Sequence, residues 1–131
     1  MKAIIIMGHG SRVPGSGDGM KRTGEIMKNK YLLEIVETCH FSRAKPDFSD
    51  ALAECVRRGA DEVTVIPYFL YTGVHVREDI PEMMREEGKK YPGVKLVCGP
   101  PLGADELLAD LVYKRAEEAR GLPDVRNVSD E

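Results

Sequence analysis

The chain has 131 residues, of which 42% are hydrophobic, so it is large enough for one compact domain with a real core. Its 19 Lys and Arg residues are outnumbered by 22 Asp and Glu residues, which excludes the basic footprint of a nucleic-acid-binding protein. No apolar run approaches the roughly 20 residues that span a bilayer, and no signal-peptide pattern opens the chain. We therefore expect a cytoplasmic protein that binds neither nucleic acid nor membrane.

The cysteines indicate neither a disulfide framework nor a thiolate zinc site. Cys39, Cys55 and Cys98 are odd in number and widely spaced, and they form no C-x-x-C pair. We expect all three to be small buried apolar residues.

The N-terminal segment predicts a buried strand followed by a helix. Residues 2–7 form a short, uninterrupted apolar run rich in isoleucine, which is typical of a strand covered on both faces in a parallel sheet. A glycine-rich loop at 15–19 follows, which we interpret as a flexible connector, with an active-site lid as the alternative. The helix predicted for residues 18–30 places three apolar side chains at helical spacing: Met20, Met27 and Tyr31.

The middle of the chain repeats this alternation. Residues 32–41 alternate apolar and polar residues only in part, as expected of a strand at or near a sheet edge. Asp47 is the predicted N-cap of the next helix and Gly59 its stop. The helix carries an apolar stripe: Phe48, Leu52, Cys55 and Val56. Residues 62–71 then form a second strongly apolar strand.

The remaining elements are a helix, a strand and a final helix. Asp79 is the predicted N-cap of the third helix, with Pro81 early in it and an apolar stripe of Met83, Met84 and Tyr91. Residues 94–98 are the fourth strand. Residues 104–120 are the fourth helix, with Gly121 as its stop and five side chains on one apolar face: Leu107, Leu108, Leu111, Val112 and Ala116.

This fourfold alternation predicts an α/β fold. Right-handed crossovers turn it into an open four-stranded parallel sheet of flavodoxin-like order, with helices on both faces. We expect a single domain over residues 1–121 and a flexible C-terminal tail over residues 122–131.

Two histidines follow strands that are neighbours in a flavodoxin-like order. His9 comes directly after the first strand, between Gly8 and Gly10, whose missing Cβ atoms allow a sharp turn and the close approach of a bulky ligand. His75 comes after the third strand, where Gly73 is expected to act in the same way. Ligands of open α/β sheets bind at the carboxyl ends of the strands, and adjacent strands are about 4.8 Å apart. The two imidazoles are therefore predicted to converge on one point.

Charged residues gather in the same loops. Although the whole chain is acidic, four cationic residues follow strand ends: Arg12, Arg43, Lys45 and Arg77. This grouping indicates a polyanionic ligand. Glu78 is a candidate for orienting His75 or relaying protons, whereas capping explains Asp79.

Several enzyme classes lack their required motif. A histidine phosphatase normally has arginine before its histidine, where this chain has Gly8. The chain also lacks a P-loop, a G-x-G-x-x-G fingerprint and a nucleophile elbow. Two histidines are too few for a closed structural metal site, but they suit an enzyme that holds a metal ion transiently and passes it on.

Three segments resemble the small, single-domain sirohydrochlorin chelatases, which insert cobalt or nickel into a tetrapyrrole. They are GHGSR at 8–12, IPYFLYTGVHVREDIP at 66–81 and GPPLGADELLADLV at 99–112. The resemblance spans roughly residues 1–120 and implies a chelatase-like domain, a homodimer, and sirohydrochlorin as the partner. It also implies that His9 and His75 are metal ligands, and that His9 is the base that accepts a pyrrole proton.

The resemblance further implies how the substrate is held. Lys45 is a substrate contact, and a wall for the macrocycle is formed by Leu70, Tyr71, Thr72, Gly73, Val74 and His75. Sirohydrochlorin carries several carboxylates, which Arg12, Arg43 and Arg77 are positioned to bind. A neutral imidazole both ligates a divalent ion and accepts a proton.

The chain departs from relatives that carry glutamates near positions 42–45, because it has Ser42, Arg43 and Lys45 there. Either His40 or Glu78 compensates as an auxiliary group, or the cations strengthen substrate binding at the expense of proton transfer. Imidazole suits Co²⁺, Ni²⁺ and Fe²⁺ alike, with Co²⁺ preferred by the resemblance, and no organic cofactor is expected. The alternative function is a non-catalytic carrier of metal or tetrapyrrole.

Overall fold

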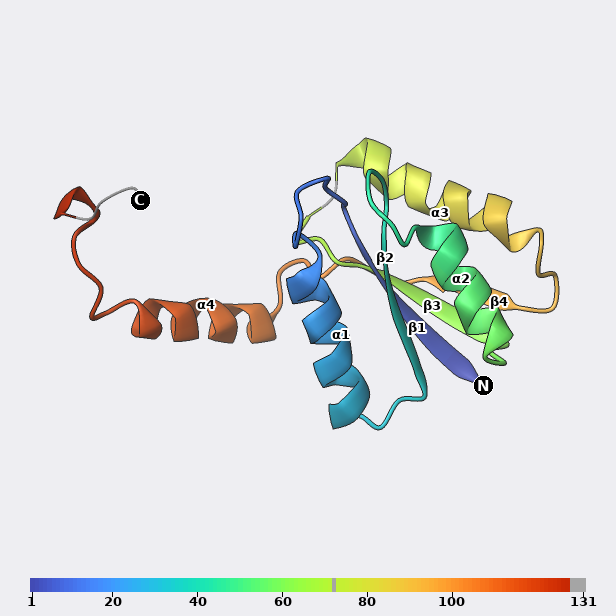
Figure 1. Cartoon of the computed structure of the whole chain (residues 1–131), viewed down its shortest axis with the longest axis horizontal. Coiled ribbons are helices and arrows are strands. Elements are labelled where there is room, and N and C mark those ends of the chain that lie inside the picture. Colours follow the sequence, from blue (N-terminus) through green and yellow to red (C-terminus); the bar gives the residue numbers. More distant parts are fainter. Residues whose placement is uncertain (72, 128–131) are drawn as a thin grey trace.

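The computed structural model describes residues 1–71 and 73–127, apart from the side chain of His75. All strands of its sheet are parallel, in the order β2-β1-β3-β4 (Figure 1). The strands are β1 Lys2–Gly8, β2 Ile35–His40, β3 Glu62–Pro67 and β4 Lys95–Cys98. The helices are α1 Asp18–Lys30, α2 Phe48–Arg57, α3 Val74–Gly88 and α4 Glu106–Glu118, and a 3₁₀ turn follows at Val125–Asn127. The predicted α/β fold is confirmed, including β1 and β3 as neighbours and β2 at an edge.

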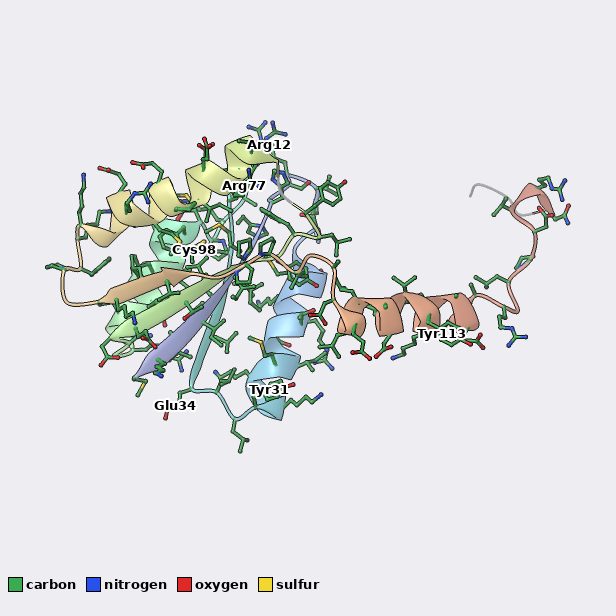
Figure 2. All side chains as sticks on the ribbon, turned by 180° about the vertical axis from the view of Figure 1, so that it is seen from behind. Arg12, Tyr31, Glu34, Arg77, Cys98 and Tyr113 are labelled. Carbon is green, nitrogen blue, oxygen red and sulfur yellow. The ribbon has the colours of Figure 1, made fainter. Side chains whose placement is uncertain are left out.

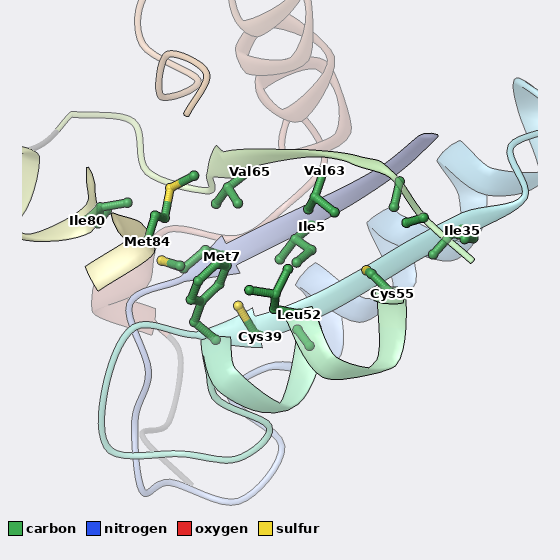
Figure 3. Packing of buried hydrophobic residues seen from close by; sticks show 14 of the residues in the cluster. Ile5, Met7, Ile35, Cys39, Leu52, Cys55, Val63, Val65, Ile80 and Met84 are labelled. Atoms are coloured by element: carbon green, nitrogen blue, oxygen red, sulfur yellow. The ribbon is translucent and has the colours of Figure 1, made fainter. Parts of the chain in front are cut away.

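The main core lies between one face of the sheet and helices α2 and α3. Ile5 and Met7 of β1 and Val63 and Val65 of β3 are buried on this face, where they meet helix residues of the same cluster, among them Leu52, Cys55, Ile80 and Met84 (Figure 3). The opposite face is covered by α1 over β1 and β2, where Gly24 packs against Ile6, Val36 and Thr38. Helices therefore lie on both faces.

Helix α2 begins and ends where the sequence predicts. The Asp47 carboxylate accepts a hydrogen bond from the Asp50 amide at 3.0 Å, and the Asp50 carboxylate accepts one from the Asp47 amide at 3.1 Å. This reciprocal capping box satisfies two donors that the helix leaves open. Gly59 follows with φ +97°, a conformation that glycine adopts without strain.

Helix α3 begins earlier than predicted. Its first residue is Val74 and its N-cap is Gly73, so Asp79 is not the N-cap and Pro81 lies inside the helix. The cause is an apolar stripe at four-residue spacing, in which half-buried Val76 precedes buried Ile80 and Met84. Packing of this stripe on the core outweighs the hydrogen bond that Pro81 cannot donate.

Helix α4 forms within the predicted range, but none of its residues is buried and it projects from the rest of the molecule (Figure 1). Two side chains that were predicted on apolar or buried surfaces are exposed. Tyr31, predicted on the apolar face of α1, is 63% exposed, and the Lys30 ammonium lies 5.6 Å from its ring centroid. Cys98 is exposed at the end of edge strand β4, whereas Cys39 and Cys55 are buried as predicted.

The C-terminal segment contains the Val125–Asn127 turn within the predicted tail, and residues 128–131 of that tail lie outside the described part of the chain. Over the described ranges, no helix is both long enough and apolar enough to cross a bilayer.

Candidate metal and tetrapyrrole site

Backbone hydrogen bonds hold the loop around His9 between its two neighbours. Beyond the end of β1, the Phe41 amide donates to the Gly8 carbonyl at 2.7 Å and the Ser42 amide donates to the His9 carbonyl at 3.1 Å. On the other side, the Tyr68 amide donates to the Met7 carbonyl at 2.7 Å. Parallel pairing thus continues past the strands, so the backbone of His9 has a fixed position at the carboxyl edge of the sheet.

Intramolecular packing requires a glycine on one side of His9. Gly10 has φ +101°, and a Cβ atom there would lie 1.6 Å from the Ser42 carbonyl oxygen. A Cβ atom at Gly8 would lie 2.7 Å from the sulfur of Met20, which is the end of a flexible side chain and can move aside. Gly73 differs from the expectation, because it has φ −70° and a Cβ atom added there would meet no atom within 4 Å.

The imidazole of His9 is exposed and uncommitted. Its ring centroid lies 5.2 Å from that of Phe69 and 6.4 Å from that of Phe41, so two aromatic rings hold it in place. Among the described residues, no hydrogen bond or ion pair occupies its nitrogens. The ring can therefore ligate a metal ion or accept a proton without first losing a partner.

An apolar surface borders one side of His9. Leu70, Tyr71 and Val74 are 58%, 85% and 59% exposed, which is unusual for large apolar side chains so close together in the chain. Leu70 and Tyr71 also line a depression of about 440 Å³, together with His9, Phe69, Gly73 and Val76. This surface is suited to a flat, apolar ligand. Thr72, predicted in the same wall, lies outside the described residues.

A more polar cavity of about 370 Å³ borders the other side of His9. Its lining includes Ser11, Ser16, His40 and Tyr68. The His40 ring packs so closely on Gly17 that a Cβ atom there would lie 2.8 Å from its Cε1. The structure thus brings His40, an auxiliary candidate, to the same cavity as His9.

Three aromatic residues of the site were not predicted: Phe41, Tyr68 and Phe69. Each follows a strand directly or by one residue, at the edge where ligands bind, and that position is the signal that could have found them. The Tyr68 hydroxyl lies 3.3 Å from the Thr23 hydroxyl, within hydrogen-bond distance, which links β3 to α1 beside the cavity.

The backbone of position 75 lies in the first turn of α3. The side chain of His75 is outside the described part, so its convergence with His9 remains a prediction. Positions 78 and 79 follow at the three- and four-residue spacings that share a helix face with position 75, and Glu78 is exposed. Among the described side chains, which do not include that of His75, no three His, Cys, Asp or Glu residues are grouped to hold a metal ion.

The four predicted cations are all exposed, but they differ in their partners. The Lys45 ammonium lies 2.7 Å from the Asp47 carboxylate and 3.5 Å from that of Asp50. This contact raises the pKa of Lys45 and lowers the pKa of Asp47. In the described part of the chain, Arg12, Arg43 and Arg77 form no ion pair, and Figure 2 shows Arg12 and Arg77 beside the N-terminal end of α3. These three guanidinium groups are available to a ligand.

Comparison with known proteins gives a consistent result. The CbiX family model matches residues 3–119. The chloroplastic sirohydrochlorin ferrochelatase of Arabidopsis thaliana is 37% identical over 87% of this chain and 51% of that protein. The sirohydrochlorin cobaltochelatase of Methanosarcina acetivorans is 32% identical over 88% of this chain and 95% of that protein.

The fold is shared with a solved chelatase. The structure of the sirohydrochlorin chelatase SirB from Bacillus subtilis subspecies spizizenii in complex with cobalt has a TM-score of 0.80 and 30% sequence identity, over 89% of this chain and 50% of that one. The chain thus spans about half the length of the Arabidopsis and Bacillus proteins and nearly all of the Methanosarcina protein.

The chain thus combines a parallel sheet, an uncommitted histidine beside an apolar surface, and similarity over most of its length to proteins named sirohydrochlorin chelatases. The chain belongs to the CbiX family. The predicted resemblance is therefore confirmed.

Proposed function

We propose that this protein is a sirohydrochlorin chelatase, which inserts a divalent metal ion into the tetrapyrrole with release of two protons. The observation that carries the proposal is the exposed imidazole of His9, whose nitrogens have no partner among the described residues, between an apolar surface and unpaired guanidinium groups. Relatives named as cobalto- and ferrochelatases of the same tetrapyrrole support it.

In the proposed reaction, the metal(II) ion is a substrate held by His9 and His75. Two imidazoles leave coordination positions open, so the pyrrole nitrogens can replace the protein ligands one after another. Each of two pyrrole N–H groups loses a proton as its nitrogen binds the metal. His9 accepts these two protons in turn and passes each to water, because an imidazole nitrogen that has released the metal has a lone pair with which to bind a proton.

The macrocycle is proposed to lie on the wall predicted at residues 70–75. Leu70, Tyr71 and Val74 provide its apolar contact, with Thr72, Gly73 and the His75 position completing the wall. Its peripheral carboxylates pair with Arg12, Arg43 and Arg77, whose guanidinium groups suit carboxylate geometry. Lys45 is a further contact that must be shared with Asp47.

Two auxiliary groups are proposed in place of the carboxylates missing near positions 42–45. His40 lines the polar cavity with His9 and is placed to pass protons from it to water. Glu78 lies one helical turn after position 75, where a carboxylate orients a histidine ligand.

We propose Co²⁺ as the metal substrate, with Ni²⁺ and Fe²⁺ as alternatives, and a place in cobalamin or modified-tetrapyrrole biosynthesis. The matched relatives are named for both cobalt and iron, and nitrogen ligands accept all three ions. We also propose that the protein acts as a homodimer, because a second copy supplies about the length by which the Arabidopsis and Bacillus proteins exceed this chain.

The test is an anaerobic absorbance time course with sirohydrochlorin and Co²⁺, repeated with Ni²⁺ and Fe²⁺. The wild type should form many products per chain above the spontaneous rate, and the His9→Ala, His75→Ala double variant should not. Arg57→Gln, on α2 at the other end of the sheet, is the control that should retain turnover. A carrier would bind the tetrapyrrole or metal with no excess of product over protein, and that result would favour the alternative function.

A further inference from the structure

A pair of hydroxyl groups links β3 to α1 beside the polar cavity of His9. Tyr68 follows β3 directly, and its amide donates to the Met7 carbonyl at 2.7 Å, so its backbone is held at the carboxyl edge of the sheet. Its hydroxyl oxygen reaches α1 and lies 3.3 Å from the hydroxyl oxygen of Thr23. Tyr68 and His9 line the same cavity of about 370 Å³. The proposed reaction leaves this tyrosine hydroxyl without a role.

The direction of the hydrogen bond between the two hydroxyls follows from the other bond of Thr23. A threonine hydroxyl has one hydrogen to donate and two lone pairs. Thr23 donates that hydrogen to the Gly19 carbonyl at 2.9 Å, because a carbonyl oxygen can only accept. In the contact with Tyr68, the Thr23 oxygen therefore accepts and the tyrosine donates. The hydroxyl hydrogen of Tyr68 is thus directed toward α1.

The oxygen of Tyr68 keeps a lone pair that can accept a further hydrogen bond. Among the described residues, its hydroxyl has no hydrogen-bond partner besides Thr23. Tyr68 is half-buried, and a hydrogen bond that is partly shielded from water is stronger than one in bulk solvent. The side chain therefore offers the cavity an acceptor whose hydrogen is already committed elsewhere.

An acceptor of this kind suits water that is bound to a metal ion. A divalent ion held by His9 and His75 keeps open positions, which water fills until the tetrapyrrole arrives. Such a water binds the ion through its oxygen, so its hydrogens point outward and it donates hydrogen bonds. A tyrosine hydroxyl whose hydrogen pointed toward the ion would instead be repelled by the positive charge.

We propose that Tyr68 accepts a hydrogen bond from a water molecule bound to the metal substrate, and that Thr23 is the positioning residue that keeps the tyrosine hydrogen turned away. The pair stabilises the hydrated ion on its histidine ligands until the macrocycle displaces the water. The proposal rests on the proposed metal substrate at His9. It adds two residues that neither ligate the ion nor contact the macrocycle.

The first test is the affinity for Co²⁺, Ni²⁺ and Fe²⁺ in turn without tetrapyrrole, measured by anaerobic calorimetric titration. Tyr68→Phe removes the oxygen and keeps the ring, and should weaken binding about tenfold, as the loss of an outer-shell partner does. Thr23→Val removes the hydroxyl that directs Tyr68 and should weaken binding about threefold, the effect of one ordinary hydrogen bond. Thr23→Ser keeps this hydroxyl and should bind like the wild type. Tyr91→Phe and Thr64→Val change half-buried residues that do not line the cavity, and these matched controls should also bind like the wild type.

The second test is a double-variant cycle, which separates positioning from a purely structural role. In the Tyr68→Phe background, Thr23→Val should cause no further loss of metal affinity, because no tyrosine hydrogen is left to direct. A loss that is equal in both backgrounds would show that Thr23 does not act through Tyr68, and would overturn its positioning role. Equal metal affinity of Tyr68→Phe and the wild type would overturn the whole proposal.

Steady-state kinetics distinguish the metal ion from the macrocycle as the group that Tyr68 serves. Tyr68→Phe should raise KM for the metal ion and leave KM for sirohydrochlorin unchanged, because the polar cavity and the apolar depression border different sides of His9. A rise in KM for sirohydrochlorin alone would place Tyr68 against the macrocycle and overturn the proposal.

The outcomes also separate this proposal from the chelatase activity. Metal affinity that depends on Tyr68, in a wild type that shows no turnover, would contradict the chelatase activity alone. Turnover by a wild type whose metal affinity is unchanged in Tyr68→Phe would contradict the role of Tyr68 alone. Binding of none of the three ions, or binding that persists in the His9→Ala, His75→Ala double variant, would overturn both.

Discussion

The carbonyl oxygen of Ser42 occupies the space that a side chain at Gly10 would need. A Cβ atom at position 10 would lie 1.6 Å from this oxygen, and Gly10 also has φ +101°. The loop after β1 and the loop after β2 therefore touch through their backbones. This contact positions the histidine at residue 9 relative to the cations that follow β2.

We expect Gly10→Ala to destabilise the protein by about 3 kcal/mol, because the backbone must move away from Ser42 and a non-glycine residue is strained at this φ. Urea unfolding measures the loss. Gly19→Ala is the control, since no atom lies within 4 Å of the added methyl group and alanine favours helix α1. Equal midpoints for Gly10→Ala and wild type would show that the two loops are not in contact.

Strands and the α2 cap were predictable because the determining signals are local. The apolar run at 2–7 and the Asp47 cap act through neighbouring residues, and both appear as expected. The start of α3 could not be predicted in this way, because its N-cap Gly73 makes no side-chain hydrogen bond. The packing of Ile80 in the core, which fixes this helix, depends on the sheet. Amphipathicity likewise identified the apolar face of α4 but not that this face is exposed.

The site was predictable in part for the same reason. The position of His9 follows from strand ends, which sequence patterns locate well. The aromatic ring of Phe69 beside it, and the pairing of Lys45 with Asp47, arise from side-chain directions that no residue pattern specifies.

Exposed apolar residues of the wall should govern tetrapyrrole affinity. We expect Leu70→Ser, Tyr71→Ser to raise KM for sirohydrochlorin at least tenfold, because each buried apolar side chain contributes about 1.5–3 kcal/mol. Folding stability should be almost unchanged, since both side chains are more than half exposed in the free protein. Leu122→Ser, an equally exposed apolar residue beyond α4, is the control in steady-state kinetics. An unchanged KM in the double variant would place the macrocycle elsewhere.

The guanidinium groups of Arg12 and Arg77 should bind carboxylates of the substrate. We expect Arg12→Gln and Arg77→Gln each to raise KM about three- to tenfold at low salt, with less effect on kcat. The difference from wild type should shrink as salt rises, because exposed charges are screened over about 10 Å at 0.1 M. Arg57→Gln removes a cation that is paired with Glu54 and should leave KM unchanged. A salt-independent change in KM would argue against carboxylate binding.

The three thiols should differ sharply in reactivity. Burial raises the pKa of Cys39 and of Cys55 to about 12, and both side chains are buried. Burial also raises the pKa of Cys98, but this residue is exposed. Because the thiolate is the reactive form, iodoacetamide at pH 8 should modify one thiol per native chain and all three in denaturant. Mass spectrometry of the Cys98→Ser variant should show no native labelling; labelling of Cys39 or Cys55 would contradict their burial.

The Asp47 carboxylate should stabilise α2 in a pH-dependent way. A hydrogen bond from Lys45 and one from the Asp50 amide lower the pKa of Asp47 in the folded state. The contribution of the Asp47 carboxylate to folding stability is therefore present above the unfolded pKa, near 3.9, and is lost as the pH falls through the folded value. The same contact raises the pKa of Lys45. The contribution of its ammonium group to folding stability is therefore present below the unfolded pKa, near 10.4, and is lost only as the pH rises through the folded value.

Asp47→Ala removes both the cap and the charge and should cost about 1 kcal/mol at pH 7. Asp47→Asn keeps an acceptor for the Asp50 amide and should cost less, so the difference between the two variants isolates the cap. Urea midpoints at pH 3, 5, 7 and 9 should show the full cost of Asp47→Asn between pH 5 and 9 and a smaller cost at pH 3, where this carboxylate is largely protonated in the unfolded chain. Asp18→Ala, at the start of α1 where the N-cap makes no side-chain hydrogen bond, should show a smaller change. A cost of Asp47→Asn that is the same at pH 3 and pH 7 would mean that the charge of Asp47 does not stabilise the helix.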